Sequence, residues 1–239
     1  MQSFRSSINR LLKMFKELLI KYFSFIYILH NLYIKNKYYI KRDTYADSGE
    51  DKFILKKIKK GKFYVDVGCH HPLRINNCHL LYENNWRGVN IDINEVSIKI
   101  FDYVRREDLN INSAVSLSKG YVNYFYDKPL SGYTSLIKKK DLKKTKKIKS
   151  NRLDSILDGT KYKNKKIDFL SIDAEGKDFD VLKSLDFKRY EPKSICIEIW
   201  GKAKKKNFNL KKNSIYKFLK KKKYHLVFNK KENYIFLKN

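Results

Sequence analysis

Residues 63–93 read FYVDVGCHHPLRINNCHLLYENNWRGVNIDI and decide the fold. The stretch begins with an aromatic and β-branched run at 63–67 and ends with a second apolar run at 88–93, and both are typical of strands. Residues 76–83, between them, have helical character. A strand, a helix and a second strand within about thirty residues form the crossover that two neighbouring parallel strands require. The sequence therefore predicts a βαβ unit here.

A second βαβ unit is predicted further along the chain. The apolar runs IDFLSI at 167–172 and SICIEIW at 194–200 flank a segment, 179–185, whose apolar residues share one helical face. Continuous apolar runs indicate strands that are buried on both faces, as in a parallel sheet covered by helices. Downstream, 213–222 is predicted as a helix and 225–237 as an antiparallel hairpin. The predicted fold class is therefore α/β, doubly wound, with a mostly parallel sheet and a C-terminal antiparallel strand.

The first 44 residues differ in pattern from the rest of the chain. Apolar residues recur at helical spacing through residues 11–34, with lysines between them, and predict an amphipathic helix. Its apolar run is far shorter than the ~20 residues that cross a bilayer. The helix therefore either rests on an anionic membrane surface or packs on its own domain or a second subunit. We divide the chain into this N-terminal helical segment, 1–44, and one α/β domain, 45–239.

The composition is strongly basic. Lys and Arg number 54 against 25 Asp and Glu, which gives a formal net charge of +29. Such a charge suggests nucleic acid or an anionic membrane as partner. A genome with a low G+C content, however, also favours Lys at solvent-exposed positions. A hydrophobic fraction of 42% excludes a disordered chain. Three scattered cysteines and the lack of a cleavable signal favour the cytoplasm, with contact at the inner face of the membrane through residues 11–34.

Residues 111–150 lie between the two βαβ units. Short strands are predicted at 114–117 and 121–126. They are followed by a stretch, 138–149, that carries eight Lys against one Asp. Like charges at this density repel one another and resist packing. We therefore expect 138–149 to form a solvated loop over the site, or alternatively a phosphate-binding loop.

The first candidate site lies where the strands of the first unit end. Asp66 and Gly68 close the first strand, and Asp92 closes the second. In a parallel α/β sheet, a glycine there lets the backbone approach a bound nucleoside, and an acid one strand over accepts the ribose hydroxyls. The three-glycine fingerprint of dinucleotide binding is missing, so a nucleoside without phosphates, such as S-adenosylmethionine, fits better. The predicted cofactor-binding residues are Asp66, Gly68, Cys69, Asp92, Ile93 and Asn112.

A second candidate site lies at the end of the next predicted buried strand, where SIDAEG at 171–176 presents Asp173 and Glu175. A carboxylate there can accept the proton of an attacking hydroxyl, and Asp173 is the first choice for this base, with Glu175 second. His70 and His71 are further candidates, although a histidine beside a turn is more often structural. The predicted catalytic set is Asp173, Glu175 and His70. Two acids are too few to predict a divalent metal site.

Four arginines lie nearest the predicted loops: Arg74, Arg87, Arg105 and Arg106. One of them is a candidate to bind a phosphate or a carboxylate. Most of them are expected at the surface.

Four stretches, in order, resemble the FkbM-type methyltransferases: VDVGCHHP, GVNIDI, IDFLSIDAEGKDFDVLKSL and PKSICIE. The resemblance covers about residues 45–200 and implies a Rossmann-like class I methyltransferase sheet, S-adenosylmethionine as methyl donor, and O-methylation, often of sugar or polyketide hydroxyls. By this resemblance Asp66 and Gly68 match the cofactor loop, and Asp92 matches the ribose acid. Asp173, Glu175 and Gly176 match the motif beside the substrate. The chain departs from many members where CHHP replaces a small residue and Asn-Ile-Gly, so this loop belongs to a variant subgroup or has shifted contacts.

The leading hypothesis is an S-adenosylmethionine-dependent O-methyltransferase that acts on a hydroxyl of a sugar, in a surface glycan or its precursor. The alternative is a nucleic-acid-binding protein or an RNA methyltransferase that uses the lysine-rich surface, although the sequence contains no RNA-binding signature that we identify. A nicotinamide-dependent oxidoreductase would share the fold and Asp92, but the missing glycines oppose it.

Overall fold

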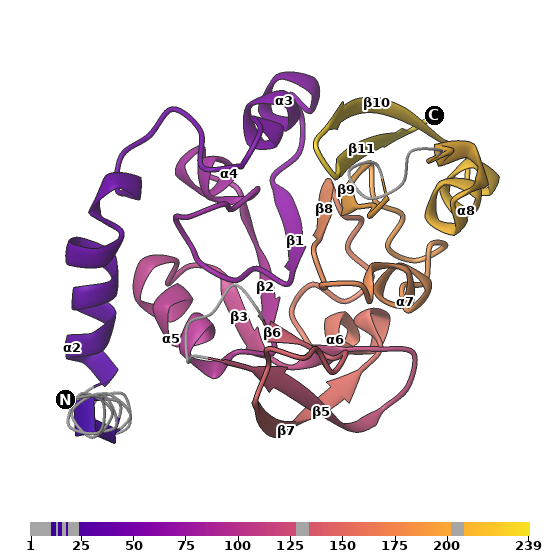
Figure 1. The fold of residues 1–239 in the computed structure, drawn as a ribbon. Coiled ribbons are helices and arrows are strands. Elements are labelled where there is room, and N and C mark those ends of the chain that lie inside the picture. The colour runs from indigo at the N-terminus through magenta and orange to yellow at the C-terminus, as the bar shows by residue number, and fades with distance from the viewer. Residues whose placement is uncertain (1–10, 13, 16–17, 19–23, 128–133, 202–207) are drawn as a thin grey trace. The chain divides into compact units, whose positions relative to one another are not determined.

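The structure is a computed structural model that describes residues 11–12, 14–15, 18, 24–127, 134–201 and 208–239. Residues 1–42 and residues 43–239 form two compact units (Figure 1).

The described part of the first unit is helical. Residues 11, 12, 14, 15 and 18 have helical backbone. Further along, α2 spans Ser24–Leu29, the π-helix η1 spans His30–Lys35, and the 3-10 turn η2 spans Lys37–Tyr39. The helix predicted over 11–34 is thus present at the described residues. Of the helices in the described ranges, none is both long enough and apolar enough to cross a bilayer.

A seven-stranded mixed sheet runs through the described residues of the second unit (Figure 1). Its strands are β1 Phe63–Val67, β2 Arg87–Asp92, β3 Leu109–Asn112, β8 Phe169–Ile172, β9 Ser194–Glu198, β10 Tyr224–Lys230 and β11 Asn233–Lys238. In the order β10-β11-β9-β8-β1-β2-β3, the strands from β9 to β3 pair in parallel, whereas β11 pairs antiparallel with β9 and with β10. The sheet and its helices confirm the predicted α/β class.

Alternate side chains of the central strands pack on two helical layers. The helices are α3 Glu50–Lys57, α4 His79–Glu83, α5 Glu95–Val104, α6 Leu153–Asp158, α7 Asp178–Lys183 and α8 Ser214–Lys221, with the 3-10 turn η3 at Leu210–Lys212. From β1, Val65 and Val67 pack in a cluster with residues of α6, α7 and α8. Tyr64 packs in a separate cluster with Ile54 of α3 and Leu81 of α4. Because both faces of the sheet are covered, its central strands are buried at nearly every position.

A second sheet, of four strands within the described ranges, contains β4 Ala114–Val115, β5 Gly120–Tyr126, β6 Thr134–Ser135 and β7 Lys144–Asn151, in the order β4-β7-β5-β6. The expectation of a solvated loop over 138–149 is therefore wrong from residue 144 onward. Alternation explains how a lysine-rich run forms a strand. Ile148 and Ser150 are buried, whereas Lys147 and Lys149 are exposed and keep their charges in water. Counting charges along the sequence overstated their repulsion.

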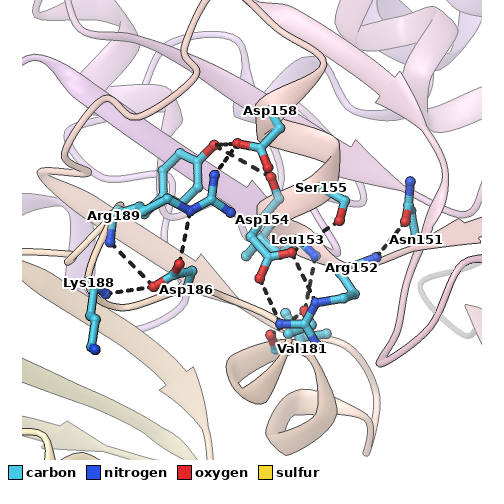
Figure 2. A network of polar contacts seen from close by, with 12 residues as sticks. Asn151, Arg152, Leu153, Asp154, Ser155, Asp158, Val181, Asp186, Lys188 and Arg189 are labelled. Carbon is cyan, nitrogen blue, oxygen red and sulfur yellow. Dashed lines mark hydrogen bonds and ion pairs between the residues drawn. The ribbon is translucent and has the colours of Figure 1, made fainter.

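A polar network fixes α6 against the chain that follows α7 (Figure 2). The Ser184 hydroxyl accepts a hydrogen bond from the buried Leu153 N–H at 3.1 Å. At the other end of α6, the Arg189 guanidinium binds Asp158 at 2.5 Å and Asp186 at 2.9 Å (Figure 2). Because α7 begins shortly after the acidic motif at 173–176, this network anchors the chain beside the second candidate site.

Candidate active site

A cavity of about 240 Å³ lies at the carboxyl ends of β1, β2 and β8. Neighbouring parallel strands present these ends at the same edge of the sheet, which is where α/β proteins bind ligands. Residues of β4 and β6, from the smaller sheet, complete the lining. Of the predicted site residues, Gly68, His70, Asp92, Ile93, Asp173 and Glu175 line this cavity. The two candidate sites of the sequence are therefore one site.

Gly68 makes the turn that brings the ends of β1 and β8 together. Its φ of +78° lies in the left-handed region, and a Cβ at this position would lie 1.8 Å from the carbonyl oxygen of Asp173. The Gly68 N–H donates to the Ile91 carbonyl at 2.9 Å, which ties the turn to β2 as well. No side chain fits here, so the glycine is required by both the conformation and the close approach.

Asp92, at the end of β2, is held by two backbone N–H groups. One carboxylate oxygen accepts from His70 at 2.8 Å and the other from Asn94 at 2.7 Å. Burial raises the pKa of Asp92 to about 6, although these two hydrogen bonds act in the opposite direction. A carboxylate has about four lone-pair positions, so each oxygen can accept a further hydrogen bond. The geometry is suited to two neighbouring hydroxyls, such as those of a ribose.

Asp66 binds the loop after β1 and is not among the residues that line the cavity. It is buried and accepts a hydrogen bond from the Asn76 amide at 3.1 Å. The fully buried Arg105 donates to the Pro72 carbonyl at 2.7 Å and to Asn76 at 2.5 Å. Burial raises the pKa of Asp66, and the charge of Arg105 opposes that rise. Arg105 is therefore a buried structural cation, whereas Arg106 is exposed and Arg74 and Arg87 are half-buried.

Cys69 and Asn112 also lie outside the cavity lining. The Cys69 side chain is buried against Ile98 and Phe101 of α5. The Asn112 amide donates to the Asp92 carbonyl at 3.0 Å, and Ser113, one residue further on, lines the cavity. The geometry thus favours Ser113 over Asn112 as a contact for a bound nucleoside.

The two histidines of the loop are both engaged by hydrogen bonds. Nη2 of Arg74 lies 3.0 Å from Nε2 of His70. Because a guanidinium can only donate, Nε2 must be the accepting nitrogen, and its lone pair is already used. His71 is buried, and its Nδ1 accepts from the N–H groups of Leu73 and Arg74, each at 3.1 Å. The structure favours positioning roles for both histidines over the predicted catalytic role of His70.

Carboxylates gather where β8 and β9 end. Oxygens of Asp173, Asp178 and Glu198 lie within 4.8 Å of one another. Although solvent still reaches Asp173, the protein around it and the charge of Glu198 raise its pKa above the usual range. Burial raises the pKa of Glu198 to about 7. A carboxylate that titrates near neutral pH can take a proton from a hydroxyl and release it again. Glu198 was absent from the predicted site, although the PKSICIE motif ends on it.

Three carboxylates at this spacing are also candidate ligands for a hard divalent cation. Asp178, however, accepts hydrogen bonds from the N–H groups of Ala174 at 2.8 Å and Gly176 at 3.1 Å. It thereby fixes the loop that follows β8. The carboxylates left for proton transfer are Asp173 and Glu198.

Glu175 is tied to the segment that follows β6. Its carboxylate pairs with Nζ of Lys139 at 2.8 Å, and both side chains are largely buried. Next to it, a Cβ on Gly176 would lie 3.2 Å from Cδ1 of Ile137. Ile137 and Lys139 therefore contact the acidic motif, and residues 134–136 line the cavity. Because the ion pair occupies one of its oxygens, Glu175 is less suited than Asp173 to act as the base.

The region around this cavity is similar to a known protein family. The sequence profile of the methyltransferase FkbM domain matches residues 66–226. The chain belongs to the FkbM methyltransferase family. This FkbM methyltransferase has every residue of the cavity lining within the matched range, and the match confirms the resemblance drawn from the four motifs. Among curated proteins, no similar sequence was found.

Proposed function

We propose that this FkbM methyltransferase uses S-adenosylmethionine to methylate a hydroxyl, and that the hydroxyl belongs to a sugar in a surface glycan or its precursor. The observation that carries the proposal is the cavity itself, where the Gly68 turn, Asp92 and Asp173 meet within the family domain. The order of the strands around β1 supports a Rossmann-like sheet of the class I methyltransferase type. The family resemblance supports a sugar hydroxyl as the acceptor.

The residues around the cavity fit a nucleoside cofactor without phosphates. Gly68 lets the backbone approach the nucleoside closely, and Asp92 accepts hydrogen bonds from the ribose hydroxyls. Ile93 and Ser113 line the cavity beside them. When bound, S-adenosylmethionine supplies a methyl group on a positively charged sulfur. This sulfur is a good leaving group when an oxygen attacks the methyl carbon.

The acidic end of the cavity serves the acceptor. Asp173 accepts the hydroxyl proton while the new carbon–oxygen bond forms and the carbon–sulfur bond breaks. Glu198 lies beside Asp173, and its pKa of about 7 allows it to share that proton and pass it to solvent. Holding both reactants in one cavity turns a bimolecular reaction into an effectively unimolecular one.

The N-terminal helix supports contact with the surface of an anionic membrane. Leu11, Phe15 and Leu18, which we call the apolar face, are 73%, 63% and 53% exposed. They are spaced four and three residues apart, so they share one side of the helix. Contact through this face, together with the basic surface, would bring the enzyme close to a lipid-linked acceptor.

A calorimetric titration with S-adenosylhomocysteine, with NAD in parallel, tests the proposal. We expect micromolar binding of S-adenosylhomocysteine alone, and its loss in Asp92→Ala. Asp141→Ala is the matched control, because Asp141 is an exposed acid outside the cavity lining. A folded protein that binds neither compound would remove the main support for methyl transfer, and a preference for NAD would indicate an oxidoreductase.

One observation favours a second candidate function, the binding of RNA. On the outer side of the smaller sheet, Nζ of Lys147 lies 5.2 Å from the ring centre of the exposed Tyr121, and Lys149 is paired with Tyr121 across the strands. Bases stack on aromatic rings, and lysines bind phosphates. Steeply salt-dependent binding of single-stranded RNA that is lost in Tyr121→Ala would support this function.

A further inference from the structure

Arg74 places a permanent positive charge in an acidic cavity. Among the lining residues that the structure describes, it is the one Lys or Arg, and it shares the lining with Asp92, Asp173 and Glu175. It lies on the loop after β1, close to the Gly68 turn. A guanidinium remains protonated at any working pH, so this charge is constant.

Among the residues that the structure describes, this guanidinium has no acidic partner. Its hydrogen bond goes to Nε2 of His70, and its buried Nε–H finds no partner within the described ranges of the chain. By contrast, Arg87, Arg152 and Arg189 each pair with a carboxylate. Arg105 also has a buried Nε without a partner among the described residues, but it lies outside the cavity lining and its Nη2 binds Asn76 and the Pro72 carbonyl. A buried donor of a charged group that makes no hydrogen bond is costly, so an arginine left in this state inside a cavity indicates a missing anionic partner.

The same guanidinium is held in place before any ligand arrives. His70 accepts from Arg74, and the N–H of His70 donates to Asp92 at 2.8 Å. This chain of hydrogen bonds links the charge to the acid at the end of β2. A pre-oriented guanidinium loses less entropy when it binds a ligand than a free one would.

We propose that Arg74 binds an anionic oxygen group, a carboxylate or a phosphate, on a molecule that occupies the cavity. Guanidinium N–H groups form short, charge-assisted hydrogen bonds with such groups, often two in parallel. The assignment of the molecule rests on the proposed function. It is either the cofactor, through the carboxylate of its methionine part, or an acidic acceptor, such as a sugar that carries a phosphate or a carboxylate.

Calorimetry on the full chain separates these two sources. Wild type, Arg74→Gln and Arg74→Lys are titrated with S-adenosylhomocysteine and with its decarboxylated analogue, which lacks only the carboxylate. Inorganic phosphate is then titrated into the same proteins, with and without S-adenosylhomocysteine. Arg106→Gln is the matched control, since Arg106 is an exposed arginine whose Nε donates to the Tyr103 carbonyl. Thermal melting confirms that each variant is folded.

If the anion belongs to the cofactor, Arg74→Gln weakens S-adenosylhomocysteine about 10- to 100-fold, with no change for the decarboxylated analogue. If it belongs to the acceptor, both nucleosides bind normally, but phosphate binding is lost in Arg74→Gln and retained in Arg106→Gln. Arg74→Lys keeps part of the affinity in either case. A folded Arg74→Gln that binds all three probes like the wild type overturns the proposal. A wild type that does not bind S-adenosylhomocysteine overturns the proposed function instead, and the phosphate titration still tests Arg74.

Discussion

Gly68→Ala tests how closely the ends of β1 and β8 must approach each other. The added Cβ would lie 1.8 Å from the Asp173 carbonyl oxygen, whereas real Cβ contacts stay beyond 3.0 Å, so the two chain segments must separate by more than 1 Å. The left-handed φ of +78° costs alanine about 1–2 kcal/mol. Forcing extra volume into a packed site adds about 1–3 kcal/mol. We therefore expect Gly68→Ala to lower the free energy of unfolding by about 2–5 kcal/mol and to weaken cofactor binding.

Gly49→Ala separates the two contributions. Gly49 has a φ of +88°, and a Cβ there would meet nothing within 4 Å, so this variant shows the backbone cost alone. Urea unfolding followed by tryptophan fluorescence gives both values, with about 1–2 kcal/mol expected for Gly49→Ala. If Gly68→Ala destabilises the protein no more than Gly49→Ala and binds S-adenosylhomocysteine normally, the close approach of the two strand ends is not needed, and the reasoning fails.

Three further predictions concern pH, the polar network and the N-terminal helix. The ribose hydroxyls donate to the ionised form of Asp92, whose pKa is about 6. The affinity for S-adenosylhomocysteine should therefore be constant above about pH 6 and fall by at most about tenfold per pH unit below it. A flat affinity from pH 7 to 5 in calorimetry would contradict this prediction. Ser184→Ala leaves the buried Leu153 N–H without its acceptor and should lower the free energy of unfolding in urea by about 1–3 kcal/mol. The control Ser155→Ala, at an exposed position, should change it by less than about 0.5 kcal/mol. Equal effects of the two variants would argue against the network. Replacing the apolar face by serines should abolish co-sedimentation with anionic liposomes at unchanged melting temperature; unchanged sedimentation would sink the membrane proposal.

The sequence predicts the larger sheet well because burial on both faces leaves a direct record. Strands that are apolar at successive positions can be recognised without knowing their neighbours. The same logic placed Gly68, Asp92 and Asp173 at the carboxyl ends of parallel strands, and the structure joins the two predicted sites in one cavity. Glu198 was not predicted, although the second βαβ unit already placed β9 beside β8, because its contact with Asp173 depends on the register of the two strands and on the path of the chain after β8.

The directions of side chains and the buried polar contacts could not be predicted from the sequence. Cys69 is next to Gly68 but packs against α5, and only the path of the loop decides this. Arg105 forms two of its hydrogen bonds with residues about thirty positions earlier in the chain, and no local sequence pattern indicates such a contact. The lysine-rich run at 144–149 was misjudged because the burial of alternate residues is visible only once its partner strand is known.

The alternation along β7 also separates the charge of the molecule from its fold. Ile148 carries the packing of this strand, whereas Lys147 and Lys149 face water. Exchanging these two lysines for glutamates would therefore reverse the polarity of the outer face of the smaller sheet without disturbing a buried contact. Substitutions at these positions can therefore change which ligands this surface attracts without changing the methyltransferase core. They can also lower the formal net charge of +29.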